Sequence, residues 1–284
     1  MSGVPSEIAK PASIQRASRS FGSLLSRAVM VVARPSVYLG VLGIASAIAL
    51  WQIILDLGIV DRRLMSAPIT VLRAAASMAA TGELVAHIGA SVARAITGLV
   101  IGSAIGIVFG LLTGRIAVFG HLTEPIAQLF RSIPAIAFVP LAIIWFGLGE
   151  QSKLFLIVFG VFFPVWINTL MGVKNVRPVY IRAARSLGVS PQQELLRVIF
   201  PAALPFIITG VRISVSIAYI MLAAAEMAGA LVGLGQLIQE SYLVFRTDRM
   251  LVGIVMLGIL GLLSDRLFMA GVRWLFPWYG AERE

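Results

Sequence analysis

Four polar residues lie in or beside long apolar stretches of the sequence, namely Arg131, Ser132, Arg212 and Glu226. A charge inside a bilayer is costly and usually indicates a function or a partner. A guanidinium also suits anions, because its fork of N–H donors matches the oxygens of a sulfonate or nitrate. These four residues are therefore candidates for a functional site within the membrane.

A structural role is the alternative for two of them. Arg212 and Glu226 could each pair with a neighbouring helix or with backbone carbonyls. They cannot pair with each other on one helix, because the rise per residue places them roughly 21 Å apart.

Other chemistry lacks the residues that it needs. The sequence has no G-x-x-x-x-G-K-[ST] phosphate loop, no G-x-S-x-G elbow, no H-E-x-x-H motif and no cysteine, and its two histidines are isolated. We therefore expect no catalytic residue, no metal site and no cofactor in this chain. Any ATP hydrolysis would have to take place in another subunit.

The composition is that of a membrane protein. Hydrophobic residues make up 59% of the chain and charged residues 13%, with a mean hydropathy of +0.95. A soluble domain carries about a quarter charged residues. The net charge of +10 is best explained by loops that face anionic membrane lipid and a protein partner. We expect no binding of nucleic acid.

The apolar runs predict an all-α polytopic membrane protein with about six transmembrane helices. The expected spans are Val37–Leu55, a part of Leu84–Thr113, Glu124–Leu148 bent at Pro134 and Pro140, Leu154–Val173, Phe200–Met227, and a last span that begins at Met250. Residues 1–35 would form an N-terminal tail, 36–270 the transmembrane domain, and 271–284 a C-terminal tail. Lysine and arginine concentrate in both tails and in the loop of residues 174–200, which predicts that all three are cytoplasmic.

Small and aromatic residues give further expectations. Four glycines at four-residue spacing predict a helix face for close packing: Gly98, Gly102, Gly106 and Gly110. Four tryptophans are interpreted as anchors at the membrane interface: Trp145, Trp166, Trp274 and Trp278. Arg94 is interpreted as a structural or snorkelling residue near the end of its helix.

The one long polar interruption, residues 180–205, predicts two short helices. Gly188 suits the left-handed position that ends the first helix. Ser190 is a good N-cap for the second, with Pro191 at its first position and Gln193 where a capping box needs it. Ala183 and Ala184 would offer a surface of little bulk, which another protein could approach closely.

This loop resembles the cytoplasmic signature of type I ABC importer permeases, E-A-A-x3-G-x9-I-x-L-P. The match runs from Arg182 through Ala183, Ala184 and Gly188 to Val198, Phe200 and Pro201, each at its expected offset. Arg182 replaces the usual glutamate and so reverses a charge, while Val198 and Phe200 keep apolar bulk. The segments RSIPAIAFVPLAIIWFGLGEQSK and TGVRISVSIAYIMLAAAEM resemble the branch that imports taurine, aliphatic sulfonates and nitrate.

The resemblance implies a homodimeric permease in the bacterial inner membrane. Two ATP-binding cassette subunits, which bind ATP and Mg, would dock on the loop, and a periplasmic binding protein would deliver the solute. The coupling residues would be Arg182, Ala183, Ala184, Gly188, Ser190 and Glu194. The resemblance also implies that the four polar residues named first, Arg131, Ser132, Arg212 and Glu226, lie in or near the translocation pathway, where an arginine could meet an anionic solute. Taurine or an alkanesulfonate is the first expectation for the cargo, with nitrate or bicarbonate and aromatic acids or vitamin precursors as alternatives. A self-sufficient secondary transporter is the alternative of a different class.

Overall fold

The computed structural model describes residues 35–61 and 64–278, and every regular element in these ranges is helical. The chain divides into two units, Met1–Pro68 and Ile69–Glu284. The first contains α2 (Pro35–Asp56), a long apolar helix whose described side chains are mostly exposed, although Leu55 is buried. Of the predicted tails, 1–35 and 271–284, residues 1–34 and 279–284 lie outside the described residues, and residues 271–275 belong to the last helix.

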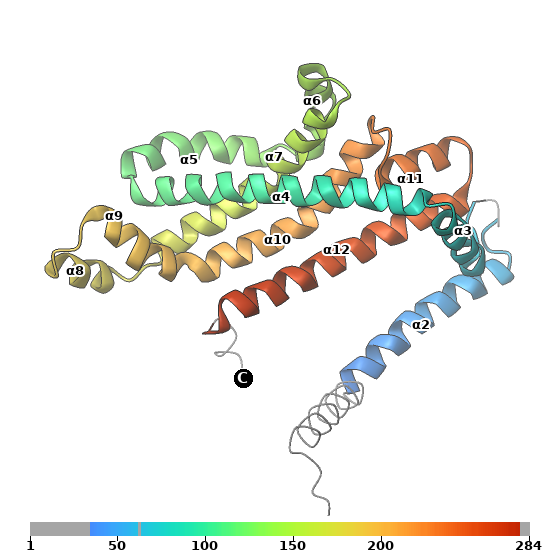
Figure 1. Ribbon diagram of the computed structural model, residues 1–284, viewed down its shortest axis with the longest axis horizontal. Coiled ribbons are helices and arrows are strands. Elements are labelled where there is room, and N and C mark those ends of the chain that lie inside the picture. The colour runs from blue at the N-terminus through green and yellow to red at the C-terminus, as the bar shows by residue number, and fades with distance from the viewer. Residues whose placement is uncertain (1–34, 62–63, 279–284) are drawn as a thin grey trace, which may run out of the picture. The chain divides into compact units, whose positions relative to one another are not determined.

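The second unit carries the remaining helices (Figure 1). In chain order they are α3 (Pro68–Ala80), α4 (Glu83–Arg115), α5 (Ala117–Ser132), the 3-10 helix η1 (Ala135–Phe138), α6 (Val139–Phe146), α7 (Glu150–Lys174), α8 (Pro178–Ser186), α9 (Pro191–Glu194), the π-helix η2 (Leu195–Ile199), α10 (Phe200–Met227), α11 (Leu234–Leu243) and α12 (Thr247–Leu275). Helices α3 and α11 lie in the connections that precede α4 and α12.

The number of membrane spans agrees with the prediction. Among the described residues, five helices are long and apolar enough to cross a bilayer, and a bent pair gives a sixth if it counts as one span. That pair is Ala117–Ser132 with Ala135–Phe146, and its two parts meet at 88°. The helix breaks at Pro134, because proline disfavours helical geometry in the residue before it. The predicted interruption at Pro134 is therefore confirmed, whereas Pro140 lies in the first turn of α6 and does not break it.

Helix α7 lies at the centre of the second unit and packs against both α4 and α10. Its inward side chains, among them Ile157, Val161 and Val165, are fully buried. The predicted glycine face of α4 lies against α7: a Cβ on Gly102 would come within 2.8 Å of Val161 Cβ. This close approach is the packing expected of small residues in membrane helices.

One tryptophan contradicts the interface interpretation. Trp166 is 2% exposed, and its indole N–H donates a hydrogen bond of 3.0 Å to Thr113 Oγ1, which joins α7 to α4. The apolar neighbours of Trp166 on α7 are compatible with a buried position as well as with an interface position. The packing of α7 against α4 buries it. Trp145, Trp274 and Trp278 are exposed, as an interface role requires.

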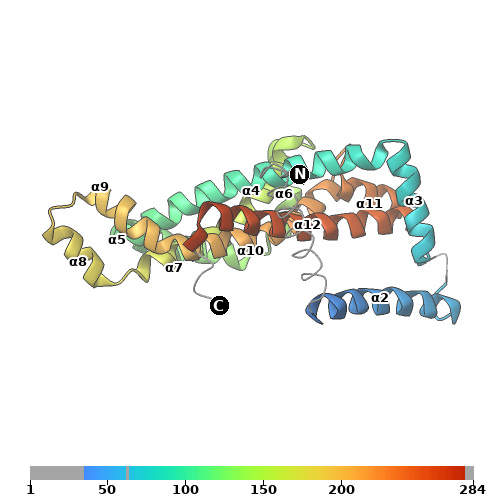
Figure 2. The same cartoon turned by 60° about the horizontal axis from the view of Figure 1, so that its bottom comes forward.

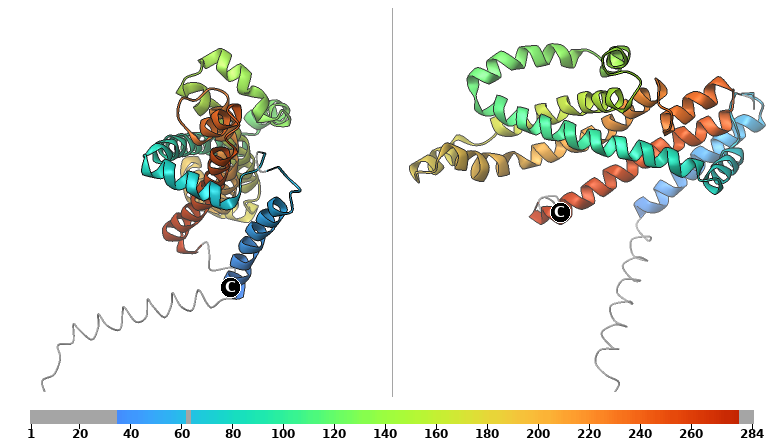
Figure 3. Two further views of the ribbon diagram at one scale, coloured as in Figure 1. Left: turned by 90° about the vertical axis from the view of Figure 1, so that its right-hand side faces the viewer. Right: turned by 45° about the horizontal axis from the view of Figure 1, so that its top comes forward.

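Two ends of the second unit carry its polar features. Helices α8 and α9 extend beyond α7 and α10 at one end, and α3 and α11 lie at the other (Figure 2). Helix α5 turns back along α4 after the single residue Ile116 (Figure 3). The signature loop and the candidate Glu226 therefore lie at opposite ends of α10.

Candidate functional site

The signature loop forms a compact helical elbow, residues 178–194, made of α8 and α9. Gly188 has φ +74, and its N–H donates to the Arg185 carbonyl at 3.0 Å. The Val189 N–H donates to the Ala184 carbonyl at 3.2 Å. These two bonds are the Schellman pattern, and glycine at its left-handed position carries no Cβ penalty. The predicted helix-ending, left-handed position of Gly188 is confirmed, and its coupling role stays a prediction.

The second helix of the elbow begins with the predicted capping box. The Gln193 N–H donates to Ser190 Oγ at 3.4 Å, and the Ser190 N–H donates to Gln193 Oε1 at 3.2 Å. Pro191 occupies the first turn, where its missing N–H costs nothing. Both corners of the elbow are therefore fixed by local hydrogen bonds.

Glu194 ties the elbow to the membrane helices. It is 2% exposed and accepts a hydrogen bond of 2.9 Å from Arg185 Nε of α8. Arg115, the last residue of α4, places Nη2 2.8 Å from the same carboxylate. Glu194 is the one acid among the basic residues of positions 174–200, which is a sequence signal for an internal partner. The structure makes it a bridge within the chain.

The two alanines of the signature do not share one surface. Ala183 is exposed, but Ala184 is buried. The expectation that both offer a low-bulk docking surface is therefore wrong for Ala184, which faces inward beneath the Schellman turn. Arg182, the charge-reversed position, is exposed and has no ion pair within the part of the chain that the structure describes.

The elbow continues directly into α10. Residues from Pro191 to Met227 form one continuous helical stretch with a π-helical segment at Leu195–Ile199. Ile199 is buried with Ala203 and with Val173 of α7, and Phe200 packs against this cluster. The base of the elbow is thus embedded in the same apolar core that holds the spans together.

The candidate pathway residue Glu226 lies in a buried polar network at the other end of α10. Its carboxylate accepts hydrogen bonds from Ser91 Oγ at 2.9 Å, Arg94 Nη1 at 2.7 Å and the Gly235 N–H at 2.9 Å. A buried carboxylate needs such partners to remain charged. Glu226 therefore pairs with neighbouring helices, as the structural alternative expected, and joins α4, α10 and the start of α11.

Arg94 is a central member of that network and does not snorkel. Its guanidinium also binds Glu150 in a bidentate pair, with Nε to Oε2 at 2.6 Å and Nη2 to Oε1 at 2.7 Å. Sequence reasoning missed Glu150, Ser91 and the meeting of three helices. The sequence did offer one signal for the pair: two apolar spans each contain a charge of opposite sign, Arg94 and Glu226.

The other three pathway candidates are placed differently. Arg212 of α10 pairs with Asp265 of α12, with Nε to Oδ1 at 2.8 Å. Arg131 and Ser132 are exposed at the end of α5, beside the 88° break, and Ser132 Oγ donates to the Gln128 carbonyl at 3.0 Å. The structure therefore does not bring the four predicted residues together within this chain.

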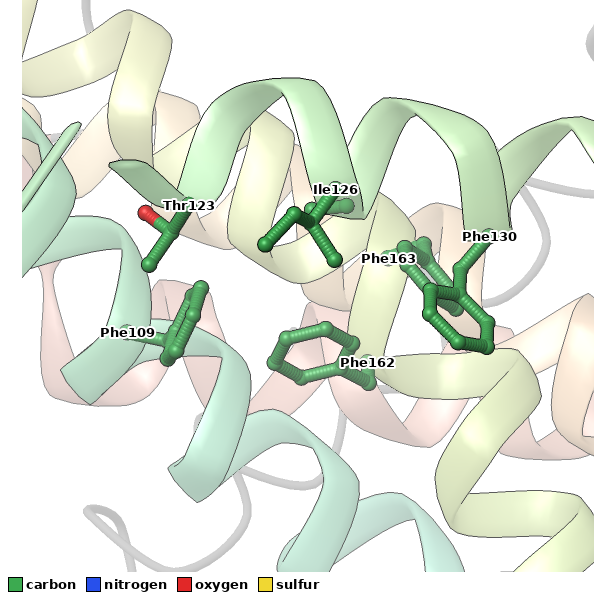
Figure 4. A pocket seen from close by; sticks show the side chains of 7 residues that line it. Phe109, Thr123, Ile126, Phe130, Phe162 and Phe163 are labelled. Carbon is green, nitrogen blue, oxygen red and sulfur yellow. The ribbon is translucent and has the colours of Figure 1, made fainter. Parts of the chain in front are cut away.

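The described residues hold no candidate metal centre, and their pockets differ in lining: one of about 120 Å³ is partly polar, with Glu83, Arg246 and Arg249 in its wall, and another is apolar. Among the described residues, no group of three or more His, Cys, Asp or Glu side chains could hold a metal ion. The apolar pocket of about 190 Å³ lies between α4, α5 and α7 (Figure 4). Its lining is apolar except for one threonine: Phe109, Thr123, Ile126, Ala127, Phe130, Phe162 and Phe163. Such a lining offers an anion no counter-charge.

The bundle of apolar helices with a capped, basic elbow defines the chain as a multi-pass membrane protein of the transport permease class. Residues 102–276 match the family described as binding-protein-dependent transport system inner membrane component, and the chain belongs to that family. This match confirms the resemblance seen in the sequence and identifies the chain as an ABC importer permease.

Curated relatives extend this match along most of the chain. The putative aliphatic sulfonates transport permease protein SsuC of Bacillus subtilis is 36% identical over 84% of this chain and 87% of its own length. The taurine transport system permease protein TauC of Escherichia coli is 39% identical over 68% of this chain and 70% of its own. The nitrate import permease protein NrtB of Synechocystis is 32% identical over 63% of this chain and 66% of its own.

Solved structures agree in fold. The inward-facing MetNI methionine ABC transporter contains a chain that matches with a TM-score of 0.57 at 24% identity, over 67% of this chain and 94% of that one. A chain of an amino acid ABC transporter crystallised with histidines gives a TM-score of 0.53 at 16% identity, over 70% of this chain and 96% of that one. The type I importer permease fold is therefore confirmed.

Proposed function

We propose that this chain is the transmembrane subunit of an ATP-driven importer for a small anionic solute, with taurine or an alkanesulfonate as the first candidate. The similarity to SsuC and TauC over most of the chain supports this choice. Nitrate or bicarbonate is the second candidate, supported by the similarity to NrtB. Aromatic acids and vitamin precursors are the third.

The proposed assembly contains two copies of this chain and two ATP-binding subunits, which bind ATP and Mg. A periplasmic binding protein delivers the solute on the opposite side. The 174–200 loop and both termini lie in the cytoplasm, as their basic residues favour. The single observation that carries the proposal is the elbow, a rigid and exposed element continuous with a membrane helix.

The elbow is built to transmit motion. A force on α8 reaches α10 through the continuous helix Pro191–Met227. It also reaches α4 through the contacts of Glu194 with Arg185 and Arg115. Packed helices move as rigid bodies when a hinge lies outside them. Closure of the ATPase pair would thus move two spans together and switch the pathway between inward- and outward-facing forms.

Arg131 and Ser132 are the pathway residues that we propose to meet the solute. Arg131 is exposed at the 88° break of the α5–α6 pair and has no ion pair within the described residues. A guanidinium in this position can offer an anion a transient partner. Arg212 and Glu226 we propose as structural residues, because each already holds a carboxylate or guanidinium partner.

Purification from native membranes tests the function. The tagged chain should co-purify with an ATP-binding subunit in equal amount, and proteoliposomes should take up taurine only with that subunit, the binding protein and ATP. Uptake by proteoliposomes that contain this chain alone would instead indicate a secondary transporter. Uptake of nitrate but not of taurine would select the second cargo.

Gly188→Pro tests the role of the elbow within that assembly. Proline has no N–H and cannot adopt φ +74, so the Schellman turn is lost. We expect ATP hydrolysis to continue while uptake falls at least tenfold. Gly188→Asn is the matched control, because asparagine tolerates the left-handed region. Equal uptake by both variants would remove the elbow from the transport mechanism.

A further inference from the structure

The tip of the elbow carries an apolar side chain that nothing in the described chain covers. Leu187 follows α8 directly and is 83% exposed. The Schellman bonds of Gly188 and Val189 and the capping box of Ser190 hold the backbone on its C-terminal side. A large apolar side chain on a rigid turn is typical of an anchor that fills a pocket on a partner.

The segment that carries this anchor is rich in exposed positive charge. Four arginines of the elbow region are exposed: Arg177, Arg182, Arg185 and Arg197. The only acid between residues 174 and 200 is Glu194, which is 2% exposed and is neutralised by Arg185 and Arg115. The outer surface of the elbow therefore presents cations with no exposed carboxylate among them.

We propose that the elbow docks into a recess with an apolar floor, which receives Leu187, and an acidic rim, which faces Arg182. The partner is the ATP-binding subunit, so the inference rests on the proposed function and adds the chemistry of its docking surface. Arg182 occupies the position where the family signature has glutamate. A permease with the usual glutamate can pair with a cation on its ATP-binding subunit. With Arg182 in that position, charge complementarity requires a carboxylate on the partner instead.

A protein recess fits the elbow better than a lipid surface does. The turn is preorganised by two Schellman bonds, a capping box and the buried Glu194 bridge, and preorganisation favours a shaped partner because less ordering is needed on binding. A fluid anionic membrane would need only the positive charge. Binding to anionic vesicles is therefore the competing outcome of the test.

The experiment measures how much ATP-binding subunit the detergent-solubilised chain retains at low and high salt. Arg182→Glu should weaken retention at least tenfold at low salt, because it places two carboxylates together. Leu187→Ala should weaken it about tenfold at both salt concentrations, as loss of an anchor does. Arg73→Glu is the matched control, an exposed arginine of α3 at the other end of the second unit, and should retain the partner fully.

A second variant makes the assignment specific. An Asp or Glu on the rim of the partner's recess, changed to Arg, should restore retention of the Arg182→Glu chain. Equal retention by wild type, Arg182→Glu and Leu187→Ala would overturn the inference while leaving the proposed function intact. If the Arg182→Glu and Leu187→Ala chains lose binding to phosphatidylglycerol vesicles but retain the ATPase as the wild type does, the inference is overturned and the elbow binds lipid instead. Failure of the wild-type chain to bind any ATPase would overturn the proposed function itself.

Discussion

Gly106→Ala tests whether the contact between α4 and α7 is as close as the structure shows. A Cβ at this position would lie 2.9 Å from the Phe162 carbonyl oxygen, 2.9 Å from Val165 Cβ and 3.1 Å from the Trp166 nitrogen. Carbon atoms in contact normally keep about 3.5–4.0 Å. Two of the three atoms belong to the backbone of α7, so a change of rotamer cannot relieve the overlap and the helices must move apart.

The expected magnitude follows from two opposing effects. Overpacking of a tight core costs about 1–3 kcal/mol. Replacing glycine by alanine within a helix returns about 0.5–1 kcal/mol. The net loss in the free energy of unfolding is about 0–2.5 kcal/mol, and about 1.3 kcal/mol from the middle of each range. At about 2–4 °C for each kcal/mol, this middle value lowers the midpoint of thermal unfolding by roughly 3–5 °C.

Two alanine substitutions are matched controls for this measurement in detergent. Gly89 lies on the same helix with nothing within 4 Å of its Cβ position, so Gly89→Ala should leave the midpoint unchanged or raise it slightly. Gly160→Ala meets Met221 Cγ at 2.6 Å, a flexible side chain that can turn away, and should fall in between. A Gly106→Ala chain as stable as Gly89→Ala would refute the close packing of α4 on α7.

Three further changes test the polar contacts of the bundle. Arg94→Met should cost about 3–5 kcal/mol, because it leaves the carboxylate of Glu226 buried without its cation; the double variant with Glu226→Gln should recover most of the loss in thermal midpoint. Trp166→Phe should cost about 1–3 kcal/mol through a lost hydrogen bond and a small cavity, measured in the same assay. Glu194→Ala should release the elbow from Arg115 and speed tryptic cleavage within residues 177–197 several-fold, with no change in oligomeric state; an unchanged cleavage rate would contradict the bridge.

Local sequence rules predicted the elbow well. Gly188, Ser190, Pro191 and Gln193 act through backbone bonds to residues within five positions, so their types and spacing decide the geometry. The break at Pro134 is of the same kind. The glycine spacing on α4 predicted a packing face, because a stacked row of small residues has few other uses in a membrane helix.

The long-range polar pairs could not be predicted in the same way. Glu226 lies 132 positions from Arg94 in the chain, and Arg212 lies 53 positions from Asp265. Spacing on one helix says only that a charge is present, not which neighbouring helix it faces. A charge in an apolar stretch has both a functional and a structural explanation, and only its partners in space distinguish them.

The positions of these pairs along α4 explain how one helix can serve both ends of the molecule. Near its start, Arg94 joins it to Glu226 of α10 and Glu150 of α7; at its end, Arg115 joins it to the elbow. Between them the glycine face holds α4 against α7 with backbones in contact. Because all three helices are fixed to one another at both ends and along their length, a force on the elbow should displace them as one body. Arg131 lies at the end of α5, which is held to α7 by Ala127 packed against Trp166 and Leu170 and by the Glu124–Lys174 pair, so such a displacement would carry the proposed solute contact with it.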